Sequence, residues 1–278
     1  MSTTERPATP RTLRVRRTGG RADVTLSRPA QRNALSLELI EELTGVLAGL
    51  GADRTVRVIV LAGDGPAFSA GHDLAEMRAH TDDPAWQSAL FSECNRLMIT
   101  LTRIPQPVIA RVHGIATAAG CQLVSMCDLA VAADTARFAL PGVNIGVFCS
   151  TPAVGVARSV GRKRAMEMLL TGAPVDAATA LDWGLVNRVV PADRLDGEVE
   201  DLARTLLARP APVVANGKRT FYAQIDEALD TAYSVAGDAM VRDLSAPDAS
   251  EGIDAFLAKR SPRWPSAAGG DESPGGAP

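Results

Sequence analysis

Hydrophobic and polar positions repeat with two different periods along the first half of the chain, and so predict both strands and helices. Segments 12–17 and 22–27 alternate as strands do, and Gly19-Gly20 between them predicts a hairpin. Ser36 precedes an apolar stripe that ends near Leu50, so we expect Ser36 to cap a helix. By the same criteria we expect strands at 56–62, 107–112 and 128–133, and helices at 84–103 and 118–125.

After Gly161 the pattern becomes mostly helical, with expected helices at 162–170, 176–181, 192–208, 212–229, 231–244 and 247–258. Alternating strands and helices that give way to consecutive helices indicate an α/β core with a helical C-terminal layer. We expect a core over 11–200 and, in the same domain, a helical oligomerisation layer over 201–263. Residues 1–10 and 264–278 are rich in Ser, Pro or Gly, so we expect disordered tails there.

Composition narrows the functional classes. The 278 residues include 29 Lys and Arg against 32 Asp and Glu, which gives no electrostatic reason to bind nucleic acid. No apolar run is long enough to cross a membrane, and the Arg-rich N-terminus lacks the apolar centre of a secretory signal. The four cysteines have no C-x-x-C spacing. We therefore expect buried, reduced thiols and a cytoplasmic location.

Several familiar catalytic motifs are missing. The three histidines, His72, His80 and His113, lack the spacing of zinc ligands, so we expect no metal site. The sequence also has no G-x-S-x-G motif, no phosphate loop with its lysine, and no G-x-G-x-x-G after a strand.

Two segments share one design, a buried strand followed by a turn of small residues and a short helix. The first continues through 68–74 (FSAGHDL) and the second through 113–123 (HGIATAAGCQL). Small residues let a ligand approach the backbone, and the first N–H groups of a helix lack partners. Two such loops can hold one oxyanion between two amides. Alternatively, they are tight turns packed for structural reasons.

These segments also carry a family resemblance. PAFSAGHDLAEM, HGIATAAGCQLVSMCDLAVAAD and FALPGVNIG resemble the crotonase (enoyl-CoA hydratase/isomerase) family, and the flanking motifs RPAQRNALS, TGAPVDAATALDWGLVNRVV and EGIDAFLAKR follow in the family's order. The resemblance covers 15–263. It implies a crotonase-like ββα spiral core, assembly as a trimer or a dimer of trimers, and an acyl-CoA thioester as ligand. Coenzyme A then enters as part of the substrate, with no separate cofactor.

The resemblance also implies roles for individual residues. The amides of Ala70 and Ala119 would grip the thioester oxygen, and the CoA channel would be lined by Arg32, Ala34, Ala70, Gly71, His72 and Asp73. Phe256 and Lys259 match positions that reach the CoA nucleotide, often that of a neighbouring subunit. Lys259 has an equally simple alternative as a solvated helix charge.

The chain departs from the family where hydratases carry two catalytic glutamates. Those positions hold Gln122 and Gly142, and neither can act as a general acid or base near neutral pH. Three candidates remain for proton transfer: His72, an ionised Cys149, or a water held by Gln122 and Asn144. His72 can instead contact CoA or pack in the core, and Cys149 can be an inert buried thiol.

Two functions are consistent with these residues, whereas a third, that of a purely structural oligomer, leaves the small residues of both loops unexplained. The first is an acyl-CoA enzyme of fatty-acid or related metabolism, hydratase/isomerase-like by descent, with weak or non-standard proton transfer. The second is an acyl-CoA binding protein without turnover. The two intact loops favour ligand binding in both cases, whereas the missing glutamates make ordinary hydration doubtful.

Overall fold

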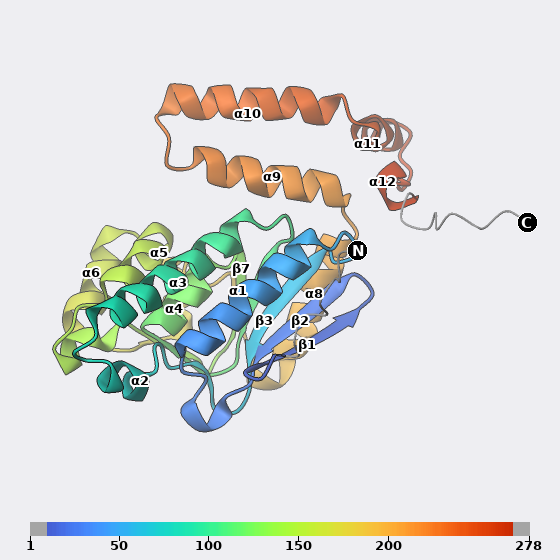
Figure 1. The fold of residues 1–278 in the computed structure, drawn as a ribbon. Coiled ribbons are helices and arrows are strands. Elements are labelled where there is room, and N and C mark those ends of the chain that lie inside the picture. Colours follow the sequence, from blue (N-terminus) through green and yellow to red (C-terminus); the bar gives the residue numbers. More distant parts are fainter. Residues whose placement is uncertain (1–9, 269–278) are drawn as a thin grey trace, which may run out of the picture.

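The structure is a computed structural model that describes residues 10–268, an α/β core with a helical arm above it (Figure 1). The expected tails fall largely on 1–9 and 269–278, which lie outside the described residues. At the start of the expected C-terminal tail, helix α12 (Pro265–Ala268) forms, and the indole of Trp264 donates a hydrogen bond to the Ala208 carbonyl at 3.0 Å. Regular structure therefore extends to Ala268.

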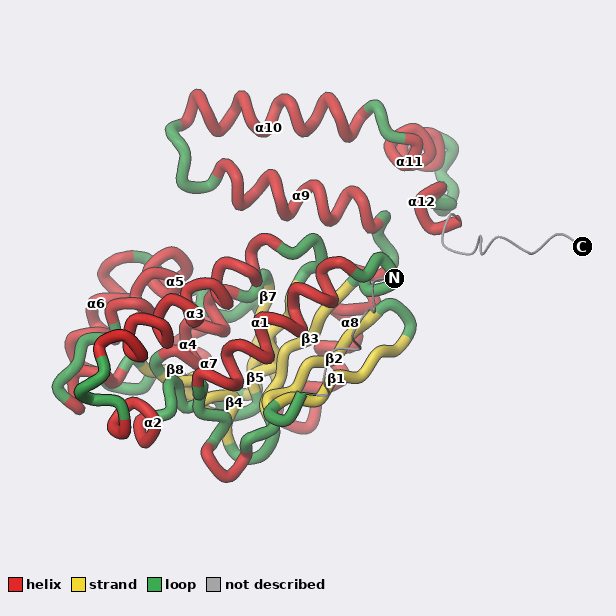
Figure 2. Tube along the Cα trace, viewed as in Figure 1, coloured by secondary structure: helices red, strands yellow, loops and turns green. Residues whose placement is uncertain are grey.

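A six-stranded sheet forms the centre of the core (Figure 2). Its strands, in spatial order, are β1 (Leu13–Thr18), β2 (Arg21–Leu26), β3 (Val58–Gly63), β5 (Val108–Val112), β7 (Leu129–Ala133) and β10 (Arg188–Val190). The predicted hairpin is confirmed, because β1 and β2 pair antiparallel from Leu13↔Leu26 to Thr18↔Arg21. The other neighbours in the sheet run parallel.

Strand β3 shows why these strands read as continuous apolar runs. Ile59 and Leu61 pack into the main core cluster, which includes residues of α1 (Leu37–Ala52) and α3 (Pro84–Arg103). Val58 and Val60 pack on the other face, in a smaller cluster with α8 (Leu195–Leu207). Successive side chains of a strand point to opposite faces, so a sheet covered on both faces needs apolar residues at every position.

A second sheet has very short strands, in the order β4 (Ala67–Ser69), β6 (Ile115–Thr117), β8 (Arg137–Ala139) and β9 (Val175–Asp176). β4, β6 and β8 each follow a strand of the large sheet within a few residues and lead into a helix or 3-10 turn. This strand–strand–helix repeat confirms the ββα spiral. The short strands were not predicted, because three residues are too few to show a period.

The helices of the core agree with most predicted segments. Ser36 caps α1 by accepting a hydrogen bond from the Leu39 amide at 3.3 Å. The others are α2 (Leu74–Ala79), α4 (Ala119–Met126), α5 (Ser150–Val160), α6 (Arg162–Thr171) and α7 (Ala177–Trp183), with 3-10 turns η1 (Pro29–Gln31), η2 (Pro141–Ile145) and η3 (Ala192–Arg194). Over residues 10–268 no helix has the length and apolarity that a membrane crossing requires.

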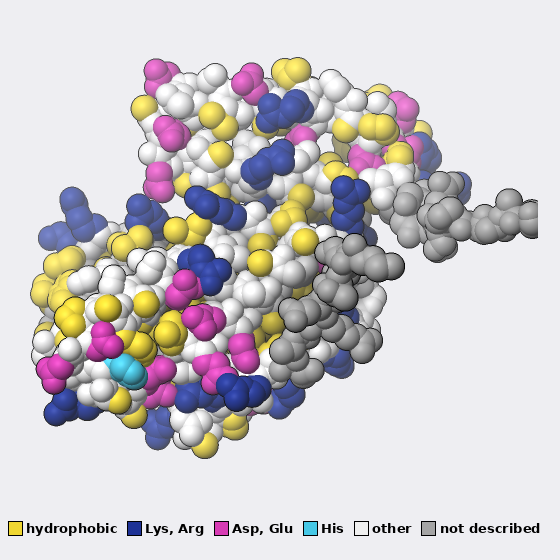
Figure 3. Space-filling view, viewed as in Figure 1, with side chains coloured by type: hydrophobic (Ala, Val, Ile, Leu, Met, Phe, Trp, Pro, Cys, Tyr) yellow, Lys and Arg dark blue, Asp and Glu magenta, His cyan; other side chains and the backbone are white. Residues whose placement is uncertain are grey.

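The C-terminal arm consists of α9 (Ala211–Gln224), α10 (Leu229–Leu244) and α11 (Pro247–Leu257). Figure 1 shows α9 against the core, with α10 lying on the far side of α9. Its exposed side chains include many large apolar ones (Figure 3), namely Leu229, Tyr233, Met240, Val241, Leu244, Ile253, Phe256 and Leu257. Large apolar side chains exposed on neighbouring helices are a common feature of protein–protein interfaces.

One buried ion pair fastens α9 to the core. The ammonium of Lys218 donates to the carbonyls of Leu101 (2.7 Å) and Gln106 (2.9 Å) and to the carboxylate of Asp128 (2.7 Å). The hydroxyl of Tyr222 donates to the other oxygen of Asp128 at 3.0 Å. The Lys218 side chain is 6% exposed, and this burial lowers its pKa while Asp128 opposes the shift. All three Lys218 protons therefore have acceptors, as a buried charge requires.

Replacing Lys218 with Met should lower the free energy of unfolding by about 3–5 kcal/mol, because Asp128 would then be a buried charge without its cation. Urea unfolding followed by circular dichroism measures this loss. Lys163→Met is the matched control, since Lys163 is exposed on α6. A loss for Lys218→Met no larger than that of the control would contradict the anchoring role.

Candidate functional site

The turn at 32–35 pairs with the loop at 70–73. The Leu35 N–H donates to the Gly71 carbonyl at 2.7 Å, and the Leu35 carbonyl accepts from the Asp73 N–H at 3.1 Å. The Ala70 N–H donates to the Arg32 carbonyl at 3.0 Å. Backbone pairing thus brings together the six residues assigned to the CoA channel: Arg32, Ala34, Ala70, Gly71, His72 and Asp73.

Two residues outside the predicted site hold this pairing in place. The Asn33 side chain is fully buried, accepts from the Arg28 amide (3.0 Å), and donates to the carbonyls of Asp64 and Ala67 (both 2.8 Å). The Arg28 guanidinium donates to the Ala34 carbonyl (2.6 Å) and to the Asp73 carboxylate (3.0 Å). Asn33 has φ +53°, a conformation that Asn tolerates better than most residues. The sequence does contain a signal for the role of Asn33, namely an asparagine in the turn that follows Pro29.

The first loop lies directly against the second. Gly71 has φ +86°, and a Cβ there would lie 2.9 Å from the Thr117 carbonyl oxygen and 3.3 Å from the Ala119 nitrogen. A Cβ on Gly120 would lie 2.3 Å from the Ser69 carbonyl oxygen. Larger residues would force the loops apart, so the packing of the two loops requires small residues at these positions. The same packing also places the residue after Gly71 next to the start of α4.

The amide directions differ from the sequence-based assignment at one position. The Ala70 N–H is used by the Arg32 carbonyl, so it is not free to bind a ligand. His72 forms a parallel bridge with Leu35 through its two neighbours, which turns its own N–H away from Leu35. No hydrogen-bond partner within residues 10–268 is found for the N–H groups of His72 and Ala119. Of the residues predicted to form the oxyanion hole or the CoA channel, His72 and Ala119 are therefore the two with open amides.

Backbone conformation at Ala118 sets the direction of the second amide. Ala118 precedes α4 with φ +49° and ψ −120°, a region that non-glycine residues rarely occupy. The peptide that carries the Ala119 N–H is consequently rotated relative to an ordinary helix start. A strained backbone conformation of this kind persists only where the surrounding contacts hold it in place. Such conformations are concentrated at ligand-binding sites.

The His72 imidazole is a buried, neutral group. It meets the edge of Phe91 at a ring distance of 5.4 Å, and its Nε2 is buried with no partner in the described structure. Burial lowers the pKa of His72 to about 4. The ring is therefore uncharged near neutral pH and is a weak base, which argues against His72 as the proton-transfer group.

No hydrogen bond joins Gln122 and Asn144 within residues 10–268, and each has its own surroundings. Gln122 lies one turn after Ala119 in α4, is 3% exposed, and has an Oε1 atom with no partner among the described residues. Asn144 is exposed in η2, and a Cβ on Gly172 would lie 2.9 Å from its Nδ2 atom. The Asn144 amide thus packs over the end of α6. The idea of a water held jointly by Gln122 and Asn144 finds no support in this arrangement.

The Cys149 thiol fills the space beside Gly142. Its sulfur accepts a hydrogen bond from the Gly142 N–H at 3.3 Å. A Cβ on Gly142 would lie 2.8 Å from that sulfur and 2.8 Å from the Val147 carbonyl oxygen. Burial raises the pKa of Cys149, which outweighs the opposing effect of the Gly142 amide, so the thiol stays protonated. These contacts support the inert-thiol alternative.

The carboxylates nearest to the loops in sequence already have partners. Asp73 caps α2 by accepting from the amides of Ala75 and Glu76, and it pairs with Arg28. Burial opposes ionisation of Asp73, but these hydrogen bonds prevail and lower its pKa. Glu76 accepts from the Leu37 amide at 3.0 Å. Within the described chain no group of three or more His, Cys, Asp or Glu is arranged to hold a metal ion.

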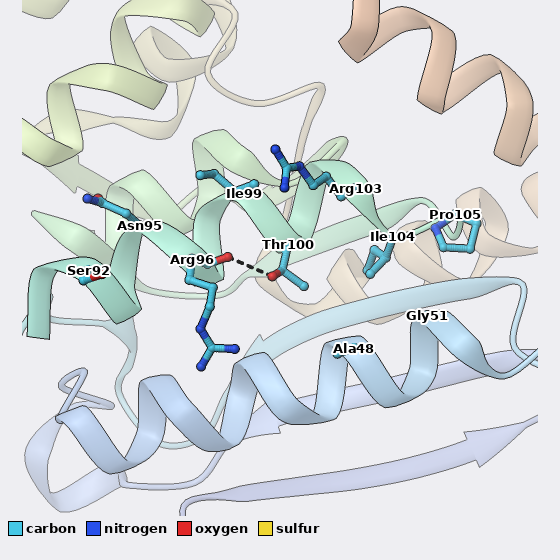
Figure 4. Close-up of a pocket in the computed structure, with 10 residues that line it drawn as sticks. All are labelled: Ala48, Gly51, Ser92, Asn95, Arg96, Ile99, Thr100, Arg103, Ile104 and Pro105. Carbon is cyan, nitrogen blue, oxygen red and sulfur yellow. Dashed lines mark hydrogen bonds between the residues drawn. The ribbon is translucent and has the colours of Figure 1, made fainter. Parts of the chain in front are cut away.

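Phe256 and Lys259 lie far from these loops in the same chain. Phe256 is 82% exposed on α11, and Lys259 follows it with φ +51°. Figure 1 shows α11 at the end of the arm, away from α2 and α4. A separate groove of about 520 Å³ between α1 and α3 (Figure 4) is lined by residues such as Asn95, Arg96 and Ile99 and contains no residue assigned to the CoA site.

Comparison with known proteins assigns the chain to a family. The family model for enoyl-CoA hydratase/isomerase matches residues 16–267. The chain belongs to the enoyl-CoA hydratase/isomerase family. Rat mitochondrial enoyl-CoA hydratase domain-containing protein 3 is 44% identical over 92% of this chain and 85% of its own length. A probable enoyl-CoA hydratase of Mycobacterium leprae is 36% identical over 87% and 93%, respectively.

Solved crotonase-fold structures agree with this assignment. Human enoyl-CoA hydratase domain-containing protein 3 superimposes with a TM-score of 0.88 at 44% identity, over 91% of this chain and all of its own. An enoyl-CoA hydratase of Mycobacterium smegmatis gives a TM-score of 0.88 at 50% identity, over 91% and 98%. The segments GHDL, ATAAGCQL and PGVNIGVFCSTP of this chain predict the branch of domain-containing protein 3, and this resemblance is confirmed.

The same comparison corrects the expected location. The rat, mouse and human relatives are each named as mitochondrial proteins. The cytoplasmic location expected from the cysteine pattern is therefore contradicted. Buried, reduced cysteines reflect local packing and do not specify a compartment.

Gly142→Glu should destabilise this crotonase fold by about 1–3 kcal/mol or more, because overpacked sites force backbone or side-chain shifts. The clash is with the Val147 carbonyl as well as with Cys149, so side-chain movement alone cannot relieve it. The measurement is chemical denaturation. Gly49→Glu is the matched control, because Gly49 is exposed on α1 with nothing within 4 Å of an added Cβ. Equal stability of the two variants would refute the packing argument.

Burial of His72 should make stability fall as the pH drops from about 6.5 to about 4. In that interval the unfolded chain binds a proton that the folded imidazole does not, so protonation favours unfolding. The pKa difference corresponds to about 3 kcal/mol of unfolding free energy. The test compares the pH dependence of denaturation in wild type, His72→Phe and the control His80→Phe. His72→Phe alone should show a flatter curve, and a curve parallel to wild type would argue against a depressed pKa.

Proposed function

We propose that this protein binds acyl-CoA thioesters and polarises the thioester carbonyl between the N–H groups of His72 and Ala119. The observation that carries the proposal is the contact of the two loops, which sets two partnerless amides side by side. Amides fixed by the fold stabilise a developing oxyanion without reorganising. The sequence analysis assigned the first of these amides to Ala70, but the Ala70 N–H already donates to the Arg32 carbonyl.

The CoA moiety would run along the paired segments that carry Arg32, Ala34, Gly71 and Asp73. Phe256 and Lys259 would reach the nucleotide of a second copy, since they lie too far from the loops of their own chain. We propose a homo-oligomer, a trimer or a dimer of trimers, in which the apolar surface of α10 and α11 is covered. A lysine near CoA phosphates is chemically suitable.

The reaction would be hydratase- or isomerase-like by descent but slow, in fatty-acid or related acyl-CoA metabolism. General acid–base groups contribute about 10²–10⁴-fold each, and both positions lack one. His72 is a weak base, and the Cys149 thiol stays protonated.

A second candidate is an acyl-CoA binding protein with no turnover. The geometry at Gly142 favours it, because Cys149 and the Val147 carbonyl fill the space that a glutamate side chain would enter. The glycine at position 142, in place of the family's glutamate, thus goes together with the way residues 142–149 pack around it.

Binding of a dienoyl-CoA should shift the absorption band of the conjugated thioester to longer wavelength, because two N–H donors draw electrons toward the carbonyl oxygen. Calorimetry should show weaker binding of the matched thioether, which keeps the chain and the CoA but lacks the carbonyl. Hydration of crotonyl-CoA should be slower than about 0.1 s⁻¹, at least 10²-fold below a typical enzyme.

Each measurement has a clear opposite outcome. Equal affinity for thioester and thioether, or no spectral shift, would exclude carbonyl polarisation. Turnover near 10² s⁻¹, typical of efficient enzymes, would show that ordinary hydration survives without the glutamates. Slow but measurable product from any acyl-CoA would decide for the enzyme, and strict inactivity for the binding protein.

A further inference from the structure

A cavity of about 560 Å³ lies where the arm joins the core. One side is formed by residues that precede β3 and β5, among them Val56 and Gln106, and the other by the first turn of α9 and by Ser266 of α12. Small-molecule sites in proteins have volumes of about 300–1,000 Å³. The cavity is therefore large enough for a small ligand, and no residue assigned to the CoA site lines it.

Positive charge gathers in this cavity. Arg54 and Arg57 line it, and no Asp or Glu does. Neither arginine forms an ion pair within residues 10–268. A larger cavity beside β1 and β2, of about 960 Å³, differs because each of its arginines pairs with an aspartate. The cavity at the arm thus holds the charge of two arginines with no carboxylate to balance it.

The guanidinium of Arg57 connects the two sides of the cavity. Its Nη2 donates to the carbonyl of Arg209, two residues before α9 begins. Its Nε is buried and has no partner in the described chain. Because a guanidinium is a rigid planar group, the unused Nε–H lies close to the start of α9.

The start of α9 supplies further donors. This helix has no side-chain cap, and its second residue, Pro212, has no N–H. Val214 donates to the Pro210 carbonyl, so the N–H groups of Ala211 and Val213 come before the helical hydrogen bonds begin. Open N–H groups at a helix start, together with the helix dipole, favour a bound anion. With Arg57 Nε they form a set of donors for an anionic group.

Gln106 supplies an acceptor to the same cavity and is 5% exposed. Its Nε2 donates to the carbonyls of Leu50 (2.9 Å) and Val56 (3.1 Å), which holds the carboxamide at the cavity wall. Its Oε1 is buried and finds no partner among the described residues. Buried polar groups are almost always hydrogen-bonded, and a carboxamide oxygen only accepts. The ligand group that meets Gln106 therefore carries an O–H or N–H.

We propose that this cavity binds a small organic phosphate that carries a hydroxyl group. The phosphate would lie between Arg57 Nε and the start of α9, with Arg54 at the exposed rim, and the hydroxyl would donate to Gln106 Oε1. A phosphate monoester has a charge of about −1.5 to −2 near neutral pH, which matches two arginines. The carbon atoms would contact the apolar side chains of Val56 and Leu206.

Such a ligand would contact the core and the arm at once. It would therefore favour the position of the arm seen here, because a ligand stabilises the state to which it binds. This inference does not depend on acyl-CoA binding by the two loops.

The experiment measures the affinity for glycerol 3-phosphate by calorimetry. Glycerol, which lacks the phosphate, should bind at least about tenfold more weakly, because the charge-assisted hydrogen bonds are lost. Propyl phosphate has nearly the same shape but no hydroxyl, and it should bind about fivefold more weakly, since Gln106 Oε1 then stays unpaired.

Two variants locate the site. Arg57→Met should weaken binding of glycerol 3-phosphate at least about tenfold, because it removes a charged donor. Ala215→Phe should weaken it to a similar degree by filling the cavity, while Arg57 stays in place. Arg162→Met is the matched control and should keep the wild-type affinity, since Arg162 is exposed on α6 and outside this cavity. Circular dichroism checks that each variant is folded.

Several outcomes would overturn the inference. A dissociation constant for glycerol 3-phosphate above about 10 mM would show that the cavity does not take organic phosphates. Equal affinity for propyl phosphate would remove the role of Gln106. Unchanged affinity in both Arg57→Met and Ala215→Phe, or displacement by excess CoA, would place the phosphate elsewhere. Failure of glycerol 3-phosphate to bind would leave the proposed acyl-CoA function untouched, because that function uses the separate loops.

Discussion

The close approach of two backbone loops is the constraint on which the site depends. Gly71 faces the Thr117 carbonyl and the Ala119 nitrogen, and Gly120 faces the Ser69 carbonyl, at distances that leave no room for a side chain. Two loops on parallel strands of one sheet can meet in this way only if both surfaces are nearly bare backbone. The absence of two Cβ atoms therefore fixes where the amides of His72 and Ala119 lie.

The polar groups around these amides are mostly neutral. Burial keeps His72 uncharged, Gln122 is an amide, and the Cys149 thiol is protonated. The neighbouring carboxylates of Asp73 and Glu76 are occupied in capping and pairing. A site of this kind can bind and polarise a carbonyl, but it has few means of moving protons. Affinity and selectivity are accordingly easier to explain from its geometry than rapid catalysis.

The arm shows a different balance of interactions. Most side chains of α9 are exposed or half-buried, whereas the Lys218 side chain reaches into the core and meets three acceptors there. The arm is held at that point by a buried charge, while α10 and α11 keep large apolar side chains in contact with solvent. The arm is therefore anchored to the core of its own chain, while the apolar side chains of α10 and α11 stay exposed. Phe256 and Lys259 lie at the end of the arm, where the proposed second copy would meet them.

The sequence by itself determined the main strands and helices and the two loops, because burial periodicity and turn residues are local properties of the chain. The family followed from the resemblance of its motifs. The sequence also located Gln122 and Gly142, where the usual glutamates are absent. Only the tertiary structure decided which amides are open. The Ala70 N–H is not open, because it donates to the carbonyl of Arg32, 38 positions earlier in the chain. The tertiary structure alone revealed Arg28 and Asn33 as the supports of that pairing, and Cys149 as the neighbour that closes the space beside Gly142. Hydrogen-bond partners and free volume depend on residues distant in sequence, and no local pattern records them.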